Sequence, residues 1–157
     1  MSDLNRREMF VGLSAFAALG VAGAEGQSGA TAGAVAAMPV LSEARVFEFD
    51  QMPVYGMANG GESRRVVTGT LVTGEAVSVH ESVLAAGITP NKPHTIQHSE
   101  LILIREGTIE FEHDGKAEKV GPGGVIYVAT GTLHTLRNVG DGPAKYFVVA
   151  MGGDVKK

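Results

Sequence analysis

The chain of 157 residues suits one compact domain with an additional segment, and it is short for two domains of ordinary size. Hydrophobic residues make up 44% of it, the formal net charge is -4, and no stripe of Lys and Arg follows a path that could track phosphates, so we expect no nucleic-acid partner. The absence of cysteine excludes disulfides, zinc–thiolate sites and a thiol nucleophile.

Residues 1–24 are typical of a secretory signal peptide. A charged start precedes an apolar run at residues 11–24, which is short for a membrane span of about 20 residues, and the run ends in a small-residue cleavage site, Ala22-Gly23-Ala24. Arg6-Arg7 followed by Phe10 resembles the twin-arginine export motif, with Asn5 where Ser or Thr is usual. An amphipathic or uncleaved N-terminal helix is the alternative.

Residues 25–42 are rich in Gly, Ala, Ser and Thr without periodicity, which predicts a flexible linker. Ala32-Gly33-Ala34 and residues 34–37 offer alternative cleavage sites. We therefore expect a periplasmic or secreted protein that keeps no stable membrane anchor after cleavage.

Residues 43–151 show a succession of short strands. In the segment 76–85, valines alternate with Ser78, His80 and Ser82, as on a strand with one apolar face. Glu106-Gly107 and Asp114-Gly115 predict tight hairpins. The expected strands are a short β-prone run that contains Val46, Phe47 and Phe49 and ends near Pro53, then 65–73, 76–85, 101–105, 108–113, 117–120, a buried strand at 125–128, 133–139 and 146–150.

Many short strands without an interior helix indicate an all-β sandwich or barrel. The C-terminal tail, residues 152–157, follows the last expected strand, and we expect it to be frayed.

Histidines and a glutamate mark two segments of this region. His94, His98 and Glu100 precede a strongly apolar strand, and His134 and Asn138 follow a glycine-rich loop further along the chain. A barrel interior solvates a carboxylate poorly, so a cation beside Glu100 would compensate its desolvation.

These two segments resemble the two motifs of the cupin superfamily. The first motif pairs two histidines with a glutamate and ends in glycine, as at Glu100 and Gly107; the second runs from glycine to a histidine and an asparagine, as at residues 123–138. The resemblance covers residues 65–151. It implies a double-stranded β-helix, the cupin or jelly-roll barrel, and a homodimer, since cupins frequently dimerise through strand exchange or sheet packing.

The resemblance assigns His94, Glu100 and His134 as ligands of one divalent metal ion. Two imidazoles and a carboxylate suit Fe, Mn, Ni, Zn or Cu, and three ligands leave positions open for a substrate. Two departures from the motifs matter: Ile96 stands where the second ligand histidine normally lies, and Ala129 replaces a proline of the second motif.

His98 is the candidate catalytic residue, as a proton donor or acceptor. On an extended strand His98 and Glu100 share one face with Cα atoms about 6.6–6.8 Å apart. His94 and His98 would be about 13 Å apart in a straight strand, so they share an ion only if residues 95–97 turn. We therefore expect His98 beside the ligand set or facing the substrate.

Four further residues have open roles. His80 suits a satisfied rim or surface position better than the barrel mouth, and His113 is expected to be exposed. Tyr127 and Arg137 either orient an anionic substrate or, more in keeping with their strands, fill edge or core positions.

The leading hypothesis is a metal-dependent cupin enzyme, of oxygenase, isomerase or lyase type, acting on a small polar organic molecule. The alternative is a non-catalytic cupin with a degenerate metal site that binds a small ligand or a protein partner. The fold does not select between substrates.

Overall fold

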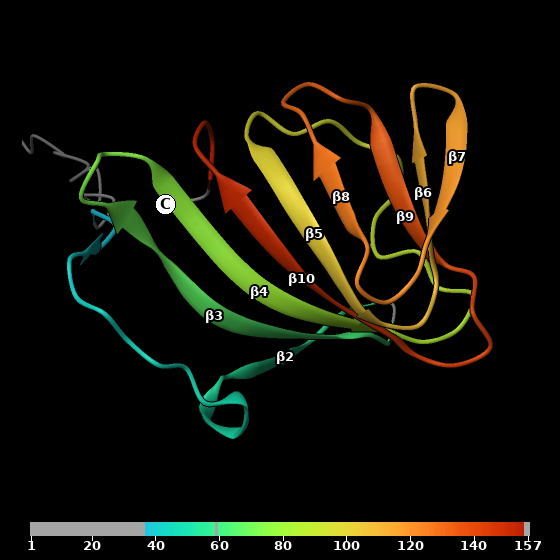
Figure 1. Cartoon of the computed structure of the whole chain (residues 1–157), viewed down its shortest axis with the longest axis horizontal. Coiled ribbons are helices and arrows are strands. Elements are labelled where there is room, and N and C mark those ends of the chain that lie inside the picture. Colours follow the sequence, from blue (N-terminus) through green and yellow to red (C-terminus); the bar gives the residue numbers. More distant parts are fainter. Residues whose placement is uncertain (1–36, 59, 156–157) are drawn as a thin grey trace, which may run out of the picture. The chain divides into compact units, whose positions relative to one another are not determined.

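The computed structural model describes residues 37–58 and 60–155 (Figure 1). The predicted signal peptide and most of the predicted linker lie outside these residues. The described residues form one compact unit. Within the described part, no helix has the length and apolar character needed to cross a membrane.

Strands and one short turn of 3-10 helix make up this unit. They are β1 (Val40–Leu41), η1 (Phe49–Gln51), β2 (Val54–Gly56), β3 (Glu62–Leu71), β4 (Ala76–Leu84), β5 (Ser99–Glu106), β6 (Ile109–His113), β7 (Lys116–Val120), β8 (Val125–Val128), β9 (His134–Asn138) and β10 (Ala144–Met151). The predicted all-β barrel is confirmed. Val40 and Leu41, expected in the linker, pair with β3 in parallel.

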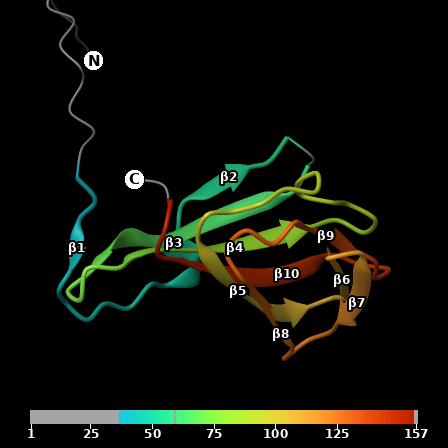
Figure 2. The ribbon, with the colours of Figure 1, turned by 90° about the horizontal axis from the view of Figure 1, so that it is seen from above.

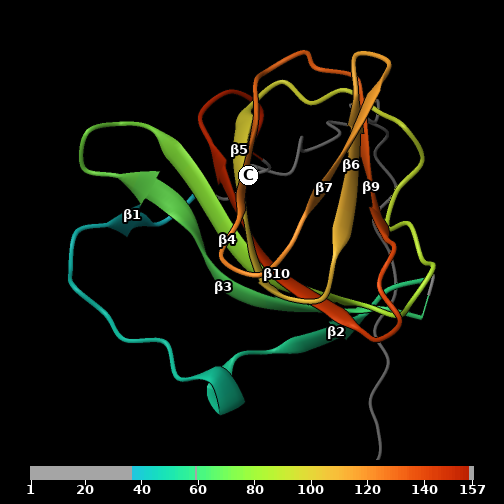
Figure 3. The same cartoon turned by 45° about the vertical axis from the view of Figure 1, so that its right-hand side comes forward.

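Two sheets enclose the interior. The larger has the order β1-β3-β4-β10-β5-β8, with β2 also paired to β3, and the smaller has the order β7-β6-β9. Figures 1 and 3 show the smaller sheet facing the strands β4, β10 and β5 across the barrel. Strand β10 lies between β4 and β5, as Figure 2 also shows, so the C-terminal strand joins the two halves of the larger sheet.

The core lies between the two sheets. Along β10 every second residue is buried, and its inner side chains include Tyr146 and Val148. They pack with Ile102 of β5 and with Ile109 and Phe111 of the smaller sheet. Burying each aliphatic side chain of this kind contributes roughly 1.5–3 kcal/mol. The period of two thus points every second side chain into the barrel, where the site lies.

The Asp114-Gly115 hairpin is confirmed, whereas the one at Glu106-Gly107 is wrong. Asp114 and Gly115 have φ of 48° and 75°, which suits the two-residue turn between paired β6 and β7. At Gly107 the chain instead crosses from the larger sheet to the smaller one. A Cβ at Gly107 would lie 2.7 Å from Ala144 Cα, so this crossing requires glycine.

Two other strand predictions need correction. Residues 46–49 form no strand, and Phe49 begins η1 with its ring 4.4 Å below the Arg64 guanidinium. Strand β8 was expected to be buried, but Val125 and Tyr127 are exposed while Ile126 and Val128 are buried, because β8 is an edge strand with one face on the core.

The tail was expected to be frayed, which is wrong for residues 152–155. Val155 is only 3% exposed, and Gly152 N–H donates to Ala76 O at 2.8 Å. Gly153 has φ of 50°, and a Cβ there would lie 1.7 Å from Gln97 O. The segment therefore packs against the loop before β5 because glycine permits the approach.

Gly153→Ala is expected to destabilise the fold more than Gly115→Ala. Both positions have positive φ, which costs an alanine about 1–2 kcal/mol, but only the Gly153 variant also drives a methyl group into the Gln97 carbonyl. Urea denaturation of the two variants measures their free energies of unfolding. The difference between them gives the cost of the clash with Gln97, separate from the cost of alanine at positive φ. Equal losses would contradict the packing described for the tail.

Candidate functional site

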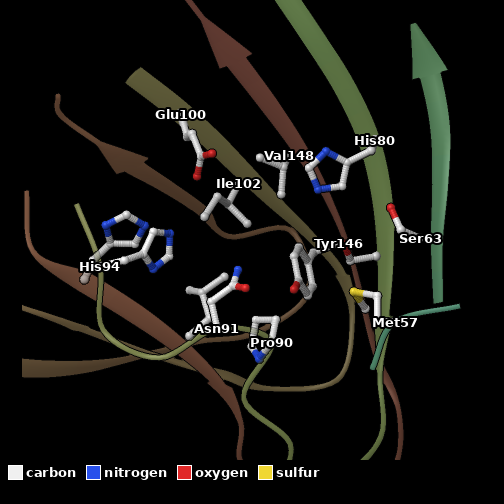
Figure 4. Close-up of a pocket in the computed structure, with 13 residues that line it drawn as sticks. Met57, Ser63, His80, Pro90, Asn91, His94, Glu100, Ile102, Tyr146 and Val148 are labelled. Carbon is white, nitrogen blue, oxygen red and sulfur yellow. The ribbon is translucent and has the colours of Figure 1, made fainter. Parts of the chain in front are cut away.

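A cavity of about 140 Å³ lies between the sheets (Figure 4). The residues that line it are Met57, Ser63, His80, Ser82, Pro90, Asn91, His94, Glu100, Ile102, His134, Leu136, Tyr146 and Val148. Three predicted site residues, His94, Glu100 and His134, are among them. His98 reaches the site through Glu100.

The backbone brings His94 and His134 together. Each N–H donates to the other's carbonyl at 3.0 Å, which forms an isolated antiparallel bridge between the loop before β5 and the start of β9. The two rings lie with centroids 4.7 Å apart at an angle of 43°. Residues distant in sequence thus present adjacent imidazoles to the cavity.

Both imidazoles are fixed in one tautomer. His94 Nδ1 lies 3.0 Å from Lys92 O, and His134 Nδ1 lies 3.0 Å from Thr132 O. Because a carbonyl oxygen only accepts, each Nδ1 carries the hydrogen, and each neutral ring keeps its lone pair on Nε2. Such an outer hydrogen bond is the arrangement that orients histidines for metal binding.

Glu100 is held by a chain of polar contacts that leads to the tail. Its Oε1 lies 3.0 Å from His98 Nε2, and His98 Nδ1 lies 2.6 Å from Asp154 Oδ1. The spacing of two residues puts His98 and Glu100 on one face, as the sequence predicts. The protonated form of His98 suits these two carboxylates best, because both ring nitrogens of an imidazolium donate hydrogen bonds.

The pKa values in this chain follow from the contacts. Burial acts to lower the pKa of His98, but the hydrogen bonds to Asp154 and Glu100 and the attraction of both carboxylates raise it on balance. The hydrogen bond from His98 lowers the pKa of Asp154. His98 is therefore a cation over a wider pH range than a free histidine.

Asp154→Asn is expected to lower the pKa of His98, because it removes a charge and an acceptor from the imidazolium. In the native protein the contribution of this raised pKa to stability is fully present below pH 6.5 and is lost as the pH rises through the folded pKa. NMR titration of the imidazole measures the change, with the exposed Asp141→Asn as control. An unchanged His98 pKa would contradict the contact.

Two histidines and a glutamate are residue types that bind a divalent ion, but the structure brings only the two histidines into contact. Among residues 37–58 and 60–155, no three His, Asp or Glu side chains converge closely enough to hold one ion. Two imidazoles are adjacent, whereas Glu100 lines the same cavity and is bound by His98. Ile96, which stands where the resemblance would place the second ligand histidine, packs into the hydrophobic core and offers no metal ligand.

His80 is a cavity residue that the sequence reasoning misjudged. It was assigned to a rim or surface position, yet it points into the cavity beside Tyr146 and Val148 (Figure 4). Burial lowers its pKa, with a raising contribution from Glu100 and a further lowering one from Arg65. The alternation at residues 78–82 contained the signal, because it put His80 on one face with Ser82.

Tyr146 completes the polar groups of the wall. It is almost fully buried, and burial is the main cause that raises its pKa to about 12. Its hydroxyl therefore keeps its proton at physiological pH and can donate a hydrogen bond to a ligand oxygen.

The remaining candidates lie away from the cavity. His113, expected to be exposed, is half-buried: its ring stacks on Phe111 at 4.7 Å and contacts Glu118 at 2.8 Å. Tyr127 is 62% exposed on the edge strand β8, which matches its edge alternative, and Arg137 is exposed on β9. Neither of the last two lines the cavity that holds the histidine pair.

Comparison with known proteins gives a match to one family model and a set of solved structures with a similar fold. A family model described as "Cupin domain" matches residues 79–150. A search of curated proteins found no match. Similar solved structures include an RmlC-like cupin from Shewanella frigidimarina NCIMB 400, with 14% identity over 69% of this chain and 91% of that chain and a TM-score of 0.58.

Two further structures carry descriptions of activity. A predicted oxalate decarboxylase from Thermotoga maritima has 17% identity over 68% of this chain and 97% of its own, with a TM-score of 0.55. A sugar phosphate isomerase from a cupin superfamily, from Silicibacter pomeroyi DSS-3, has 17% identity over 68% and 74%, with a TM-score of 0.54. At these identities the likeness concerns the fold alone.

Proposed function

We propose that the protein is a metal-dependent cupin enzyme and that the cavity binds a small polar organic molecule beside one divalent metal ion. The match of residues 79–150 to a cupin family model and the similarity of the fold to solved cupin structures support this proposal. His94, Glu100 and His134 are the proposed ligands. The observation that carries this proposal is the pair of adjacent imidazoles, each with Nδ1 donating to a backbone carbonyl and Nε2 left as the donor atom.

The ion supplies a Lewis acid or a redox centre when bound. His98 contacts Glu100 on one side and Asp154 on the other, which suits a proton donor or acceptor that acts on the cavity through Glu100. Tyr146 donates a hydrogen bond from its hydroxyl to a ligand oxygen, and Ile102, Leu136 and Val148 limit the water that reaches the site.

The reaction class stays open between oxygenase, isomerase and lyase chemistry. The structures of similar fold include proteins described as a predicted oxalate decarboxylase and as a sugar phosphate isomerase, which supports small-molecule chemistry in barrels of this kind without selecting one reaction.

Metal analysis tests the proposal. Protein purified without added metal, and protein stripped with a chelator and reloaded in turn with Fe, Mn, Ni, Zn or Cu, is analysed by elemental mass spectrometry and thermal unfolding. We expect about one ion per chain and a higher Tm for at least one metal, because binding to the folded state alone stabilises it. Less than about 0.1 ion per chain with every metal would refute the proposal.

The second candidate is a non-catalytic cupin that binds a small ligand or a protein partner. Two observations favour it: no three ligating side chains converge in the described residues, and Ile96 is a core residue. Ligand binding that is unaffected by chelation would support this candidate over the metal enzyme.

Export and dimerisation are further proposals. We propose that the protein is periplasmic or secreted. If the twin-arginine route exports it, the double substitution Arg6→Lys and Arg7→Lys should keep it in the cytoplasm.

We also propose a homodimer through the outer face of β5 and β8, supported by the exposed side chains of Leu103, Val125 and Tyr127. A monomer in size-exclusion chromatography with light scattering would contradict it.

A further inference from the structure

A second hollow adjoins the cavity. It has a volume of about 240 Å³ and is lined by Tyr55, Ser63, Arg65, Ser78 and His80. Ser63 and His80 line the cavity as well, and Figure 4 shows both at its wall. We call this second space the outer hollow. The two spaces thus lie side by side over the same face of the paired strands β3 and β4, and a ligand in the cavity can reach the outer hollow along that face.

The sheet register builds the outer hollow. Arg65 of β3 lies opposite His80 of β4, and Ser63 lies opposite Ser82. The pairing shifts between Arg65 and Val67, so the strand is irregular next to Arg65. A cation, a neutral imidazole and hydroxyl groups thus share one face at this end of the sheet.

Arg65 carries a positive charge that no neighbouring carboxylate balances. Within residues 37–58 and 60–155, Arg45 and Arg105 form ion pairs with Glu43 and Glu81, whereas Arg65 forms none. Its guanidinium lies 5.3 Å from the centroid of the Tyr55 ring, which orients the group without neutralising it.

No carboxylate is among the residues that line the outer hollow. Glu100 lines the inner cavity and not the outer hollow. The charge of Glu100 raises the pKa of His80 and the charge of Arg65 lowers it, so both act on this imidazole from opposite sides. The outer hollow itself offers a guanidinium and hydroxyl groups to a ligand.

We propose that Arg65 binds a carboxylate group of the cavity's ligand in the outer hollow, and that the ligand is a small hydroxy acid. A guanidinium pairs with a carboxylate through two parallel hydrogen bonds, and Ser63, Ser82 and Tyr146 are hydroxyl partners for the rest of the molecule. A cavity of roughly 150 Å³ admits benzene, so the body of the ligand within the cavity is of similar size. The assignment rests on the proposed small-molecule function and names its substrate class.

The test uses chelator-treated full-length protein with the probes lactate and lactamide, which differ in the carboxylate. Titrations at constant ionic strength near neutral pH, up to about 0.1 M ligand, are followed by ¹H–¹⁵N NMR. Lactate is expected to shift the signals of Ser63, Arg65 and His80, and lactamide to bind at least about tenfold more weakly, because a charge-assisted pair is lost.

Three variants accompany the probes. Arg65→Gln is expected to weaken lactate binding about tenfold and to abolish the preference for the acid, while Arg65→Lys, which keeps the charge without the planar fork, retains part of it. Arg137→Gln, on the exposed face of β9, is the matched control and is expected to leave lactate binding unchanged.

Equal affinity for acid and amide, undiminished lactate binding by Arg65→Gln, or no shift in the outer hollow at the highest lactate concentration would each overturn the assignment. Addition of Mn²⁺ to the same samples keeps the metal proposal separate, since it broadens the signals of His94 and His134 only if an ion binds there. Lactate binding without this broadening would leave the carboxylate site standing and would exclude Mn²⁺ as the ion at the histidine pair.

Discussion

His134→Ala is expected to reduce the affinity for a divalent ion by about 100-fold or more, because loss of a direct ligand should exceed the roughly 10–100-fold cost of losing an outer partner. His134 is the buried member of the imidazole pair, and its backbone bridge to His94 survives the substitution. Isothermal titration of chelator-treated protein measures the change.

His113→Ala is the matched control for this experiment. His113 lies directly opposite His134 in the register of β6 and β9, but its ring contacts Glu118 and Asp114 at the surface. The His113→Ala variant should leave metal affinity unchanged. The His94→Ala variant should lose metal affinity as His134→Ala does, without leaving a buried position empty. Equal affinity in the wild type and both pair variants would contradict the ligand assignment, provided that circular dichroism shows each variant folded.

Asn138→Ala is expected to lower the free energy of unfolding by about 3 kcal/mol or more. Asn138 is fully buried; its Nδ2 donates to Leu84 O and Gly142 O, each at 2.9 Å, and its Oδ1 accepts from Gly140 N–H at 3.0 Å. Alanine leaves three backbone groups without that partner, one buried at Leu84 and two partly buried at Gly140 and Gly142, and a buried group left in this way costs roughly 1–3 kcal/mol. The asparagine of the second motif thus ties the end of β4 to the turn before β10.

Urea denaturation measures this loss, with Arg137→Ala as control. Arg137 is the exposed neighbour on the same strand, and its removal is expected to change stability by no more than about 0.5 kcal/mol. A loss below about 1 kcal/mol in Asn138→Ala would mean that water replaces the side chain and that the three bonds do not secure the turn.

The strands were predictable from the sequence because alternation is a local property. The partners of those strands were not. The turn residues at Glu106-Gly107 indicate a reversal but not that the chain enters the other sheet there, since this depends on contact between Gly107 and Ala144. The docked tail escaped prediction for the same reason: glycines predict freedom, and the contact of Asp154 with His98 lies far along the chain.

The site was predictable in its residue types and less so in its geometry. The spacing of His98 and Glu100 correctly put them on one face, and their hydrogen bond follows. The tautomers of His94 and His134 depend on turns that bring Nδ1 to a carbonyl two residues earlier, which no residue pattern displays. His80 faces the cavity because it lies beside Val148 on the inner face of the sheet, and only the long-range pairing of β4 with β10 reveals this.

Anomalous diffraction at the metal absorption edges, on crystals of protein purified without added metal, tests the central claim most directly. The account predicts one anomalous peak in the cavity, within coordination distance of His94 Nε2 and His134 Nε2, with the carboxylate of Glu100 as the third protein ligand. A cavity without an anomalous peak after each of the five metals has been soaked in, with Glu100 still bound to His98, would contradict it and leave the barrel as a metal-free binding domain.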